Sequence, residues 1–397
     1  MKILVTTFSF PDPAIGSYDG RFVLSEVLGY AQSGASVLVL TPHYPGARRQ
    51  ERLGPGIQVR RFRYFLPEHW QRLKVPGQPI YRAGSALALL QIPLILVAFA
   101  WSILRHAGTV DLIHAQWTIT GLLALPAKWV FGTKLVITAR GSDLRLLPGW
   151  LNRWLHRRVD AAIDCFGPQP WNLAYKQANP ARYLRLPLSV DTGNPQDRAP
   201  ELEAAAREAD SPLIVLYIGR FDRIKLEHNR LPLLDLIAAA GILKSQGVPV
   251  RVFYLGDGER LIERRMREAI VAHGVSGEVT LLGPRVQVAA YARTCHLGIG
   301  GIALNGVVHD FTVNGKPQIL MTTPENVQTP WRDGVNALLV PPDDPVALAE
   351  RIAWAATHRD EIRRLGEGAK DEFKDLMTDT HEAGRLYLAA FQCLLAK

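Results

Sequence analysis

Runs of consecutive apolar residues recur along this chain, and segments with helical spacing separate them. Such runs are typical of parallel strands covered on both faces. The predicted strands are residues 2–8, 37–40, 111–115, 135–138, 161–165, 213–218, 250–255, 279–282, 297–299 and 318–321, with an alternating edge strand at 57–65. Helices are predicted over residues 20–33, 231–246, 259–273 and 382–395. The alternation predicts an α/β fold built on doubly wound parallel sheets.

The strands fall into two series that meet near residues 186–191. A chain of 397 residues with 48% hydrophobic residues can fill two cores. We predict a Rossmann-like domain over residues 1–188, a second over 189–378, and a final helix over 379–397 that packs back toward the first. Two such domains facing each other would leave a central cleft, and ligands of these sheets bind at the carboxyl ends of the strands.

Basic residues are concentrated in the first half of the chain. Residues 1–190 hold 22 lysines and arginines against 9 acidic residues, a net +13, and the remainder holds 24 against 28, a net −4. A basic domain predicts an anionic partner, either a membrane surface or a lipid diphosphate, although solubility charge is the alternative. Because no nucleic-acid motif is present, nucleic acid is not expected as a partner.

The amino terminus and the cysteines indicate a cytoplasmic protein. Pro11 and Asp12 interrupt the first apolar run, which therefore reads as a strand and not as a signal peptide. Cys165, Cys295 and Cys393 lie far apart and lack metal-binding spacing. This usage fits a reducing compartment without structural disulfides.

Two apolar segments bear on membrane contact. Residues 86–104 approach spanning length but contain Gln91 and Pro93, which favours a buried or interfacial helix over a membrane span. Residues 150–155 place tryptophan and leucine beside Arg153, Arg157 and Arg158. This segment is either a helix packed under a basic face or a contact with the membrane surface.

Charged residues and glycines follow several strands of the second series. Arg220 and Lys225 come after residues 213–218, the turn Gly256-Asp257-Gly258 comes after 250–255, and Asp310 comes after 297–299. Loops after parallel strands gather at one edge of a sheet, so two cations there suit a diphosphate. A surface salt-bridge pair is the alternative for the two cations.

An ordered set of motifs spans nearly the whole chain. The motifs are Asp19-Gly20-Arg21-Phe22-Val23, Asp111-Leu112-Ile113-His114-Ala115-Gln116-Trp117, Arg140-Gly141-Ser142-Asp143, Leu188-Ser189-Val190-Asp191-Thr192, Gly219-Arg220 with Lys225, Gly256-Asp257-Gly258, Gly315-Lys316-Pro317, Asp333-Gly334-Val335-Asn336 and Leu339-Val340-Pro341-Pro342. In this order they resemble the retaining glycosyltransferases of the GT-B group, family four, which make bacterial polysaccharides and glycolipids.

The resemblance implies a function for the whole chain. It implies a GT-B fold and a metal-independent hexosyltransferase without a cofactor, acting in cell-surface polysaccharide or glycolipid synthesis. The donor would be a nucleotide-diphosphate sugar and the acceptor a lipid-linked molecule or a saccharide. Together with the basic first half, this implies a cytoplasmic enzyme peripherally bound to the inner face of the membrane.

The resemblance also implies roles on the donor side. Arg220 and Lys225 would stabilise the departing diphosphate, Gly256 would lie in the donor-binding turn, and Gly20 would let the first loop approach the donor. Asp310 stands where the family has a glutamate that binds the ribose hydroxyls. Gly20 is alternatively an ordinary turn glycine, and Asp310 an acid that favours a helix amino terminus.

Four residues match the acceptor side of the family: Arg21, His114, Arg140 and Asp143. Many members have a histidine where this chain has Arg140, and a guanidinium cannot act as a general base, so Arg140 would bind an acceptor anion. Asp143 would orient the acceptor hydroxyl or accept its proton. The alternatives are an Arg140–Asp143 pair that caps a helix, and a buried structural role for His114.

The chain departs from the family at the donor motif, where the first of two glutamates is absent. Counting back from Asp310 reaches Ile302, and alignment from the preceding strand reaches Asn305. Asn305 and the backbone amides of residues 298–306 would then hold the transferred sugar. The competing hypotheses are a catalytically silent scaffold subunit and a sugar-nucleotide epimerase of the same fold.

Overall fold

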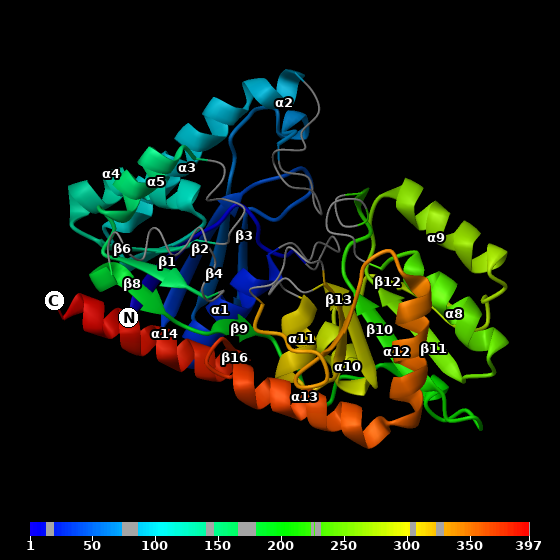
Figure 1. Ribbon diagram of the computed structural model, residues 1–397. Coiled ribbons are helices and arrows are strands. Elements are labelled where there is room, and N and C mark those ends of the chain that lie inside the picture. Colours follow the sequence, from blue (N-terminus) through cyan, green and yellow to red (C-terminus); the bar gives the residue numbers. More distant parts are fainter. Residues whose placement is uncertain are drawn as a thin grey trace. The chain divides into compact units, whose positions relative to one another are not determined.

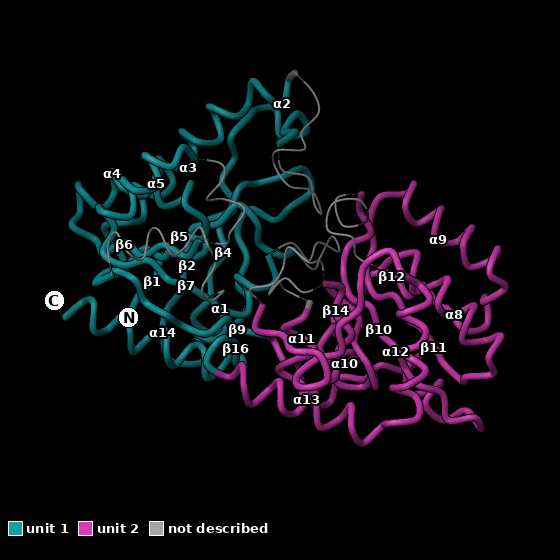
Figure 2. Tube along the Cα trace, viewed as in Figure 1, with its two compact units in different colours: residues 1–190, 375–397 teal, residues 191–374 magenta. Residues whose placement is uncertain are grey.

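The computed structural model describes residues 1–12, 20–73, 86–139, 147–165, 180–223, 226, 232–301, 307–322 and 329–396. The chain forms two compact units (Figure 2). Unit 1 comprises residues 1–190 and 375–397, and unit 2 comprises residues 191–374. The sequence placed its boundaries at 188 and 378.

Unit 1 is built on an eight-stranded sheet in the order β3-β4-β2-β1-β5-β6-β7-β8. The strands are β3 (Gln50–Gly54), β4 (Ile57–Phe62), β2 (Ser36–Pro42), β1 (Lys2–Thr6), β5 (Leu112–Gln116), β6 (Lys134–Thr138), β7 (Ala161–Asp164) and β8 (Tyr183–Arg185). All neighbours are parallel except the antiparallel pair β3 and β4. The predicted edge strand at 57–65 is therefore internal, because β3, whose polar residues carry little apolar signal, takes the edge.

Helices cover both faces of this sheet (Figure 1). They are α1 (Arg21–Gln32), α2 (Ala86–Leu90), α3 (Ile92–Ala107), α4 (Thr118–Phe131), α5 (Gly149–His156) and α14 (Thr380–Leu395). Side chains alternate across β1, so Ile3 and Val5 pack with α1 and α14 while Leu4 packs with α3 and α4. Two short 3₁₀ helices, Glu68–Trp70 and Pro180–Arg182, also belong to this unit.

The last helix belongs to unit 1 through contacts made far apart in the sequence. β9 (Leu188–Val190) pairs with β16 (Met377–Asp379), and the hydroxyl of Ser25 hydrogen-bonds both Ser189 (2.7 Å) and Thr380 (2.8 Å). Helix α14 lies on α1, where Tyr387 and Phe391 join the core. This packing orders the carboxyl terminus against the first helix.

Unit 2 is built on a six-stranded parallel sheet in the order β12-β11-β10-β13-β14-β15. The strands are β12 (Val279–Gly283), β11 (Val250–Leu255), β10 (Leu213–Ile218), β13 (Leu297–Gly301), β14 (Gln318–Met321) and β15 (Leu338–Val340). The helices are α7 (Pro200–Ala205), α8 (Asp235–Ser245), α9 (Arg260–Ala272), α10 (Val288–Thr294), α11 (Val307–Val313), α12 (Pro345–Thr357) and α13 (Arg359–Phe373). Two parallel sheets flanked by helices confirm the predicted α/β fold class.

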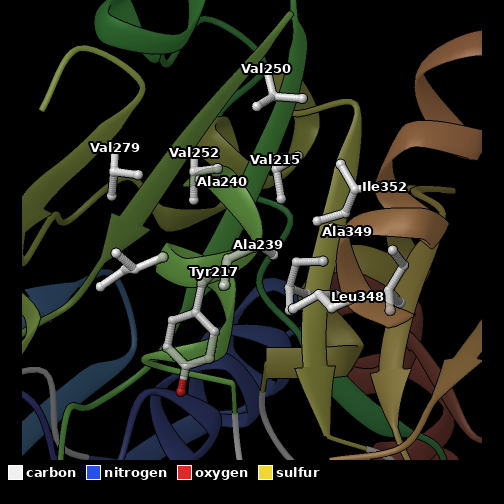
Figure 3. Close-up of a cluster of buried hydrophobic side chains, with 14 of the residues drawn as sticks. Val215, Tyr217, Ala239, Ala240, Val250, Val252, Val279, Leu348, Ala349 and Ile352 are labelled. Carbon is white, nitrogen blue, oxygen red and sulfur yellow. The ribbon is translucent and has the colours of Figure 1, made fainter. Parts of the chain in front are cut away.

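Successive side chains of the central strand enter opposite cores of unit 2. Val215 and Tyr217 of β10 pack with α8 and α12, where Figure 3 labels Ala239, Ala240 and Ile352. The alternate residues of β10 pack with α7, α10 and α11 on the other face. Burial on both faces explains the unbroken apolar run. Parallel pairing with β11 and β13 sets the direction of β10, whose carboxyl end leads to Arg220.

Candidate functional site

Two loops at the carboxyl edge of the unit 2 sheet are held together by main-chain hydrogen bonds. The amide of Gly219 donates to Leu255 O (3.0 Å), and the amide of Phe221 donates to Asp257 O (2.8 Å). Phe221 also forms a β-bridge with Gly258. The segment that carries Arg220 is therefore fixed to the glycine turn that follows β11.

The glycines of this turn are required by the close approach of the two loops. Gly256 has φ 143°, and a β-carbon there would lie 2.0 Å from Gly219 O. A β-carbon on Gly258 would lie 2.0 Å from Phe221 O. Such distances exclude any side chain unless the backbone moves, so these glycines have a structural role whether or not a ligand contacts them.

The side chain of Arg220 is partly exposed at this edge. Its Nη2 lies 3.6 Å from Oδ2 of the buried Asp222, in an ion pair whose arginine side chain is 41% exposed and whose aspartate side chain is 7% exposed. Burial and the charge of Asp222 together raise the pKa of Tyr217 beneath it. The sequence analysis did not predict a role for Asp222, although an acid two positions after a candidate phosphate-binding arginine indicates a possible ion pair. Asp222 positions Arg220 and leaves part of the guanidinium accessible.

Asp310 follows the strand next to β10. It lies in α11 after β13, is 9% exposed, and its carbonyl oxygen accepts a hydrogen bond from Asn314 Nδ2 (2.7 Å). Because β10 and β13 are adjacent and parallel, Arg220 and Asp310 belong to the same edge of the sheet. The neighbouring His309 is buried, which lowers its pKa to about 4 and keeps it neutral.

Four predicted site residues lie outside the described residues: Arg140, Asp143, Lys225 and Asn305. Their predicted roles remain predictions. Among the described residues, no group of three or more His, Cys, Asp and Glu side chains is arranged to hold a metal ion.

Gly20 and Arg21 begin α1 in unit 1. Gly20 has φ 77°, and a β-carbon there would lie 2.3 Å from Ser9 O, so close backbone packing and a left-handed conformation both require glycine. Arg21, the first helical residue, is partly exposed. The structure therefore explains Gly20 without a ligand.

His114 is a structural residue, and its assignment to the acceptor side is corrected. The side chain is 0% exposed. Nδ1 lies 3.1 Å from the Tyr30 hydroxyl and Nε2 lies 2.7 Å from Thr138 Oγ1. Both ring nitrogens are occupied, so His114 joins β5 to β6 and α1 and has no accessible atom for an acceptor.

The motif Gly315-Lys316-Pro317 lies at the opposite edge of the unit 2 sheet, because it precedes β14. A β-carbon on Gly366 of α13 would lie 2.3 Å from Gly315 O and 2.6 Å from Pro317 N. The motif is thus the surface on which α13 packs, and Lys316 is remote from Arg220 along the strands.

Two family models match the chain, one in each unit. The model described as Glycosyl transferase 4-like domain matches residues 20–166, and the model described as Glycosyl transferases group 1 matches residues 212–358. The second match includes Arg220, Gly256 and Asp310. No curated protein sequence matches the chain significantly.

Solved structures of the same fold cover nearly the whole chain. Sucrose-phosphate synthase from Thermosynechococcus elongatus has a TM-score of 0.72 and 18% identity, covering 100% of this chain and 99% of its own. Anabaena HepE, solved with UDP and glucose, has a TM-score of 0.65 and 18% identity, with 99% of each chain covered. The trehalose-6-phosphate synthase OtsA has a TM-score of 0.66 and 12% identity, with 99% of each chain covered.

Proposed function

This chain belongs to the group 1 glycosyltransferases of the GT-B fold, and from that premise we propose that it moves a hexosyl group, with retention of configuration, to a lipid-linked or saccharide acceptor. One observation carries the donor assignment to unit 2. Arg220 follows the buried strand β10, stands between two residues whose amides hydrogen-bond the β11 strand end and its glycine turn, and shares its edge of the sheet with Asp310. The solved complex of HepE with UDP and glucose supports a nucleoside diphosphate as the leaving group.

The chemistry places negative charge beside Arg220. The bond between the anomeric carbon and the diphosphate oxygen breaks, and its electron pair stays on the diphosphate. The acceptor hydroxyl oxygen forms the new bond to the anomeric carbon, and its proton leaves to the diphosphate oxygen or to Asp143. The guanidinium fork of Arg220, aided by Lys225, stabilises the charge that builds on the diphosphate, so we propose that no metal or cofactor is required.

Asp310 is proposed to accept hydrogen bonds from the ribose hydroxyls of the donor. Its carboxylate is one methylene shorter than the glutamate at this position in the resembling family, so the nucleotide would sit closer to α11. Asn305 and the backbone amides near it would hold the sugar in place of the absent glutamate. A silent scaffold would not turn the donor over, and an epimerase would change the donor sugar without an acceptor. Donor binding and dependence on an acceptor are therefore the decisive measurements.

The donor test compares UDP, GDP, ADP and dTDP, with their common sugar conjugates, by calorimetry. One nucleotide should bind selectively to the wild type, and Arg220→Ala should weaken that binding at least tenfold. Arg264→Ala, which removes the same charge from the exposed surface of α9, is the matched control and should bind normally. Lack of binding by every nucleotide would overturn the assignment. Donor turnover to a second sugar nucleotide without an acceptor would favour the epimerase.

A membrane contact is proposed for unit 1 because α3 is apolar on two sides. Among the described residues, one helical stretch, Leu87–Ala107, is long and apolar enough to cross a membrane, with mean hydropathy 2.3. The inner side of α3 packs in the protein core, where Ile95, Phe99 and Ile103 are buried. Gln91 is also buried, and its side chain hydrogen-bonds Trp70 O (2.8 Å) and Arg72 N (3.0 Å). This packing favours a helix that lies in the membrane interface over one that crosses it.

The outer side of α2 and α3 carries an exposed apolar stripe, and the neighbouring helices α4 and α5 also expose apolar side chains. The stripe comprises Leu90, Leu94, Val97 and Trp101, and the adjacent helices expose Trp129, Val130, Phe131 and Trp150. Several large apolar side chains exposed on neighbouring helices favour a membrane or protein contact. The nearby Arg105, Arg153 and Arg157 suit anionic headgroups, so we place the enzyme on the inner face of the cytoplasmic membrane.

Liposome sedimentation tests the membrane contact. The wild type should bind phosphatidylglycerol vesicles at low salt, and the double variant Val97→Asp, Trp101→Glu should lose most of that binding. Val271→Asp on α9 of unit 2 replaces an equally exposed apolar residue and is the control that should bind like the wild type. Equal vesicle binding by the double variant and the wild type would refute the contact.

A further inference from the structure

A cavity lies at the amino edge of the unit 2 sheet, opposite the edge that carries Arg220. Its volume is about 540 Å³, and its lining includes Ser211 before β10, His296 before β13 and Lys316 before β14, with Arg359 and Arg363 from α13. The six residues of β10 separate the two edges by roughly 20 Å at about 3.3 Å per residue. The cavity is therefore distinct from the proposed donor site.

The lining has more positive than negative charge. It contains Lys316, Arg359 and Arg363 against one carboxylate, Glu367. Arg363 pairs with the exposed Asp360 at 2.9 Å, but none of the described carboxylates forms an ion pair with Lys316 or Arg359. Two cations thus share a concave surface, and within the described part of the chain no carboxylate lies within 4.0 Å of either.

Among the residues that the structure describes, the partners of Arg359 are neutral groups. Its Nη2 donates to Ser211 O (2.9 Å), its Nε donates to Ala356 O (3.2 Å), and its Nη1 lies 3.0 Å from His296 Nδ1. Partial burial lowers the pKa of this guanidinium, as expected when a charge is desolvated without an opposite charge beside it. An anion in the cavity would supply the missing charge.

His296 is fixed in one tautomer by its neighbours. The amide of Ile214 (3.0 Å) and the guanidinium of Arg359 both donate to Nδ1, which must therefore be unprotonated. The proton of the neutral ring is therefore on Nε2, in a residue that lines the cavity and also hydrogen-bonds the Pro212 backbone. Burial, with the charges of Arg359 and Lys316, lowers the pKa of His296 to about 4 and keeps this arrangement at neutral pH.

The cavity is formed by rigid elements. Gly315 has φ 63°, and a β-carbon there would lie 2.6 Å from the Glu367 carboxylate. With the close contact between Gly366 and residues 315–317, this packs α13 tightly against the loop that carries Lys316. The backbone that carries Lys316 is therefore positioned before a ligand binds.

We propose that this cavity binds a small molecule bearing a phosphate group, with Lys316 and Arg359 as the charged ligands. A guanidinium fork beside an ammonium is suited to phosphate oxygens. The volume lies within the range of small-molecule sites and exceeds what one phosphate fills, so the ligand has a further polar part, such as a sugar. The proposal does not depend on the donor assignment.

Calorimetry with pyrophosphate and with a hexose 6-phosphate tests the site, in an Arg220→Ala background that weakens phosphate binding at the donor edge. One equivalent of each should bind, and the unphosphorylated hexose should not. Lys316→Gln should weaken binding at least tenfold, and Lys316→Arg should restore most of it. Lys370→Gln, an exposed lysine farther along α13, is the control and should bind normally.

Two outcomes would overturn the proposal. One is no phosphate binding in the Arg220→Ala background, and the other is equal affinity in Lys316→Gln and Lys370→Gln. If Lys316→Gln does not fold, Arg363→Gln replaces it, because that side chain is 70% exposed and its loss should still weaken binding several-fold. Nucleotide binding to the wild-type protein is measured in its own experiment. If no nucleotide bound there, the donor assignment would fail, and phosphate binding to the cavity could still be judged from the Lys316 and Lys370 variants.

Discussion

Gly256 and Gly219 lie so close that a β-carbon on Gly256 would come within 2.0 Å of the Gly219 carbonyl oxygen. Both glycines have positive φ, 143° and 150°. The contact joins the turn after β11 to the loop after β10, on which Arg220 stands. The position of the Arg220 guanidinium therefore depends on glycine at position 256, after the neighbouring strand β11.

Gly256→Ala should disturb both stability and nucleotide binding. We expect a loss of about 2–4 kcal/mol in the free energy of unfolding, since the backbone must move, and weaker nucleotide binding as Arg220 shifts. Gly247→Ala is the control: it has φ 71° and no atom within 4 Å of the added carbon. Its cost should be about 1 kcal/mol, with binding unchanged. Urea denaturation and calorimetry measure both quantities, and equal effects of the two substitutions would contradict the contact.

Gly384→Ala should separate α14 from α1. A β-carbon on Gly384 would lie 2.1 Å from Gly29 O, so we expect a loss of about 2–4 kcal/mol in unfolding free energy. Gly368 lies in the middle of α13 with no atom within 4 Å of an added carbon. Gly368→Ala should stabilise by about 0.5–1 kcal/mol through helix propensity. Thermal or urea unfolding should therefore show that Gly384→Ala lowers the free energy of unfolding while Gly368→Ala raises it.

Arg61→Ala should be strongly destabilising. The side chain is 0% exposed, lies 3.5 Å from the Asp12 carboxylate and 2.8 Å from Glu51, and donates to Pro11 O. Its removal leaves buried carboxylate charge uncompensated, which costs about 3–5 kcal/mol. Arg63→Ala removes an arginine whose pair with Glu68 is exposed, and should cost less than about 1 kcal/mol. Similar unfolding midpoints for the two variants would refute this assignment.

Stability should decrease as the pH falls from about 6.5 toward 4. Burial lowers the pKa values of His156 and His309 from 6.5 to about 4, so in this interval the unfolded chain binds protons that the folded chain does not. Each histidine should cost up to about 3 kcal/mol at the acidic end, at about 1.4 kcal/mol per pKa unit. His309→Leu and His156→Leu should each make the pH dependence of unfolding less steep. An unchanged slope in both variants would show that neither histidine is responsible.

Parts of the fold that bury apolar residues on both sides could be predicted from the sequence. The apolar runs of β1, β10 and β11 and the helical spacing of α1 are local, so the alternation of strands and helices predicted the α/β class. The strand β3 was missed because its residues, QERLG, alternate between partly buried and exposed. Its pairing with β4 depends on the turn between them and on no apolar pattern of its own.

The candidate site was predictable only in part. The order of Arg220, Gly256 and Asp310 after successive strands indicated a shared edge. The sequence could not show that Asp222 holds Arg220, or that Tyr30 and Thr138 occupy both ring nitrogens of His114. Those contacts join residues from different elements, and a motif match does not record which partner a side chain meets.

The sequence alone determined where the buried strands and the amphipathic helices form and which loops follow those strands, because these depend on local burial patterns and on chain order. The tertiary structure alone decided which residues share an edge of the sheet with partners far along the chain. Ser211, His296, Lys316 and Arg359 line one cavity only because β10, β13 and β14 pair in parallel and α13 packs across their amino ends. Strand pairing and helix packing are long-range contacts, and only they turn scattered cations into a site.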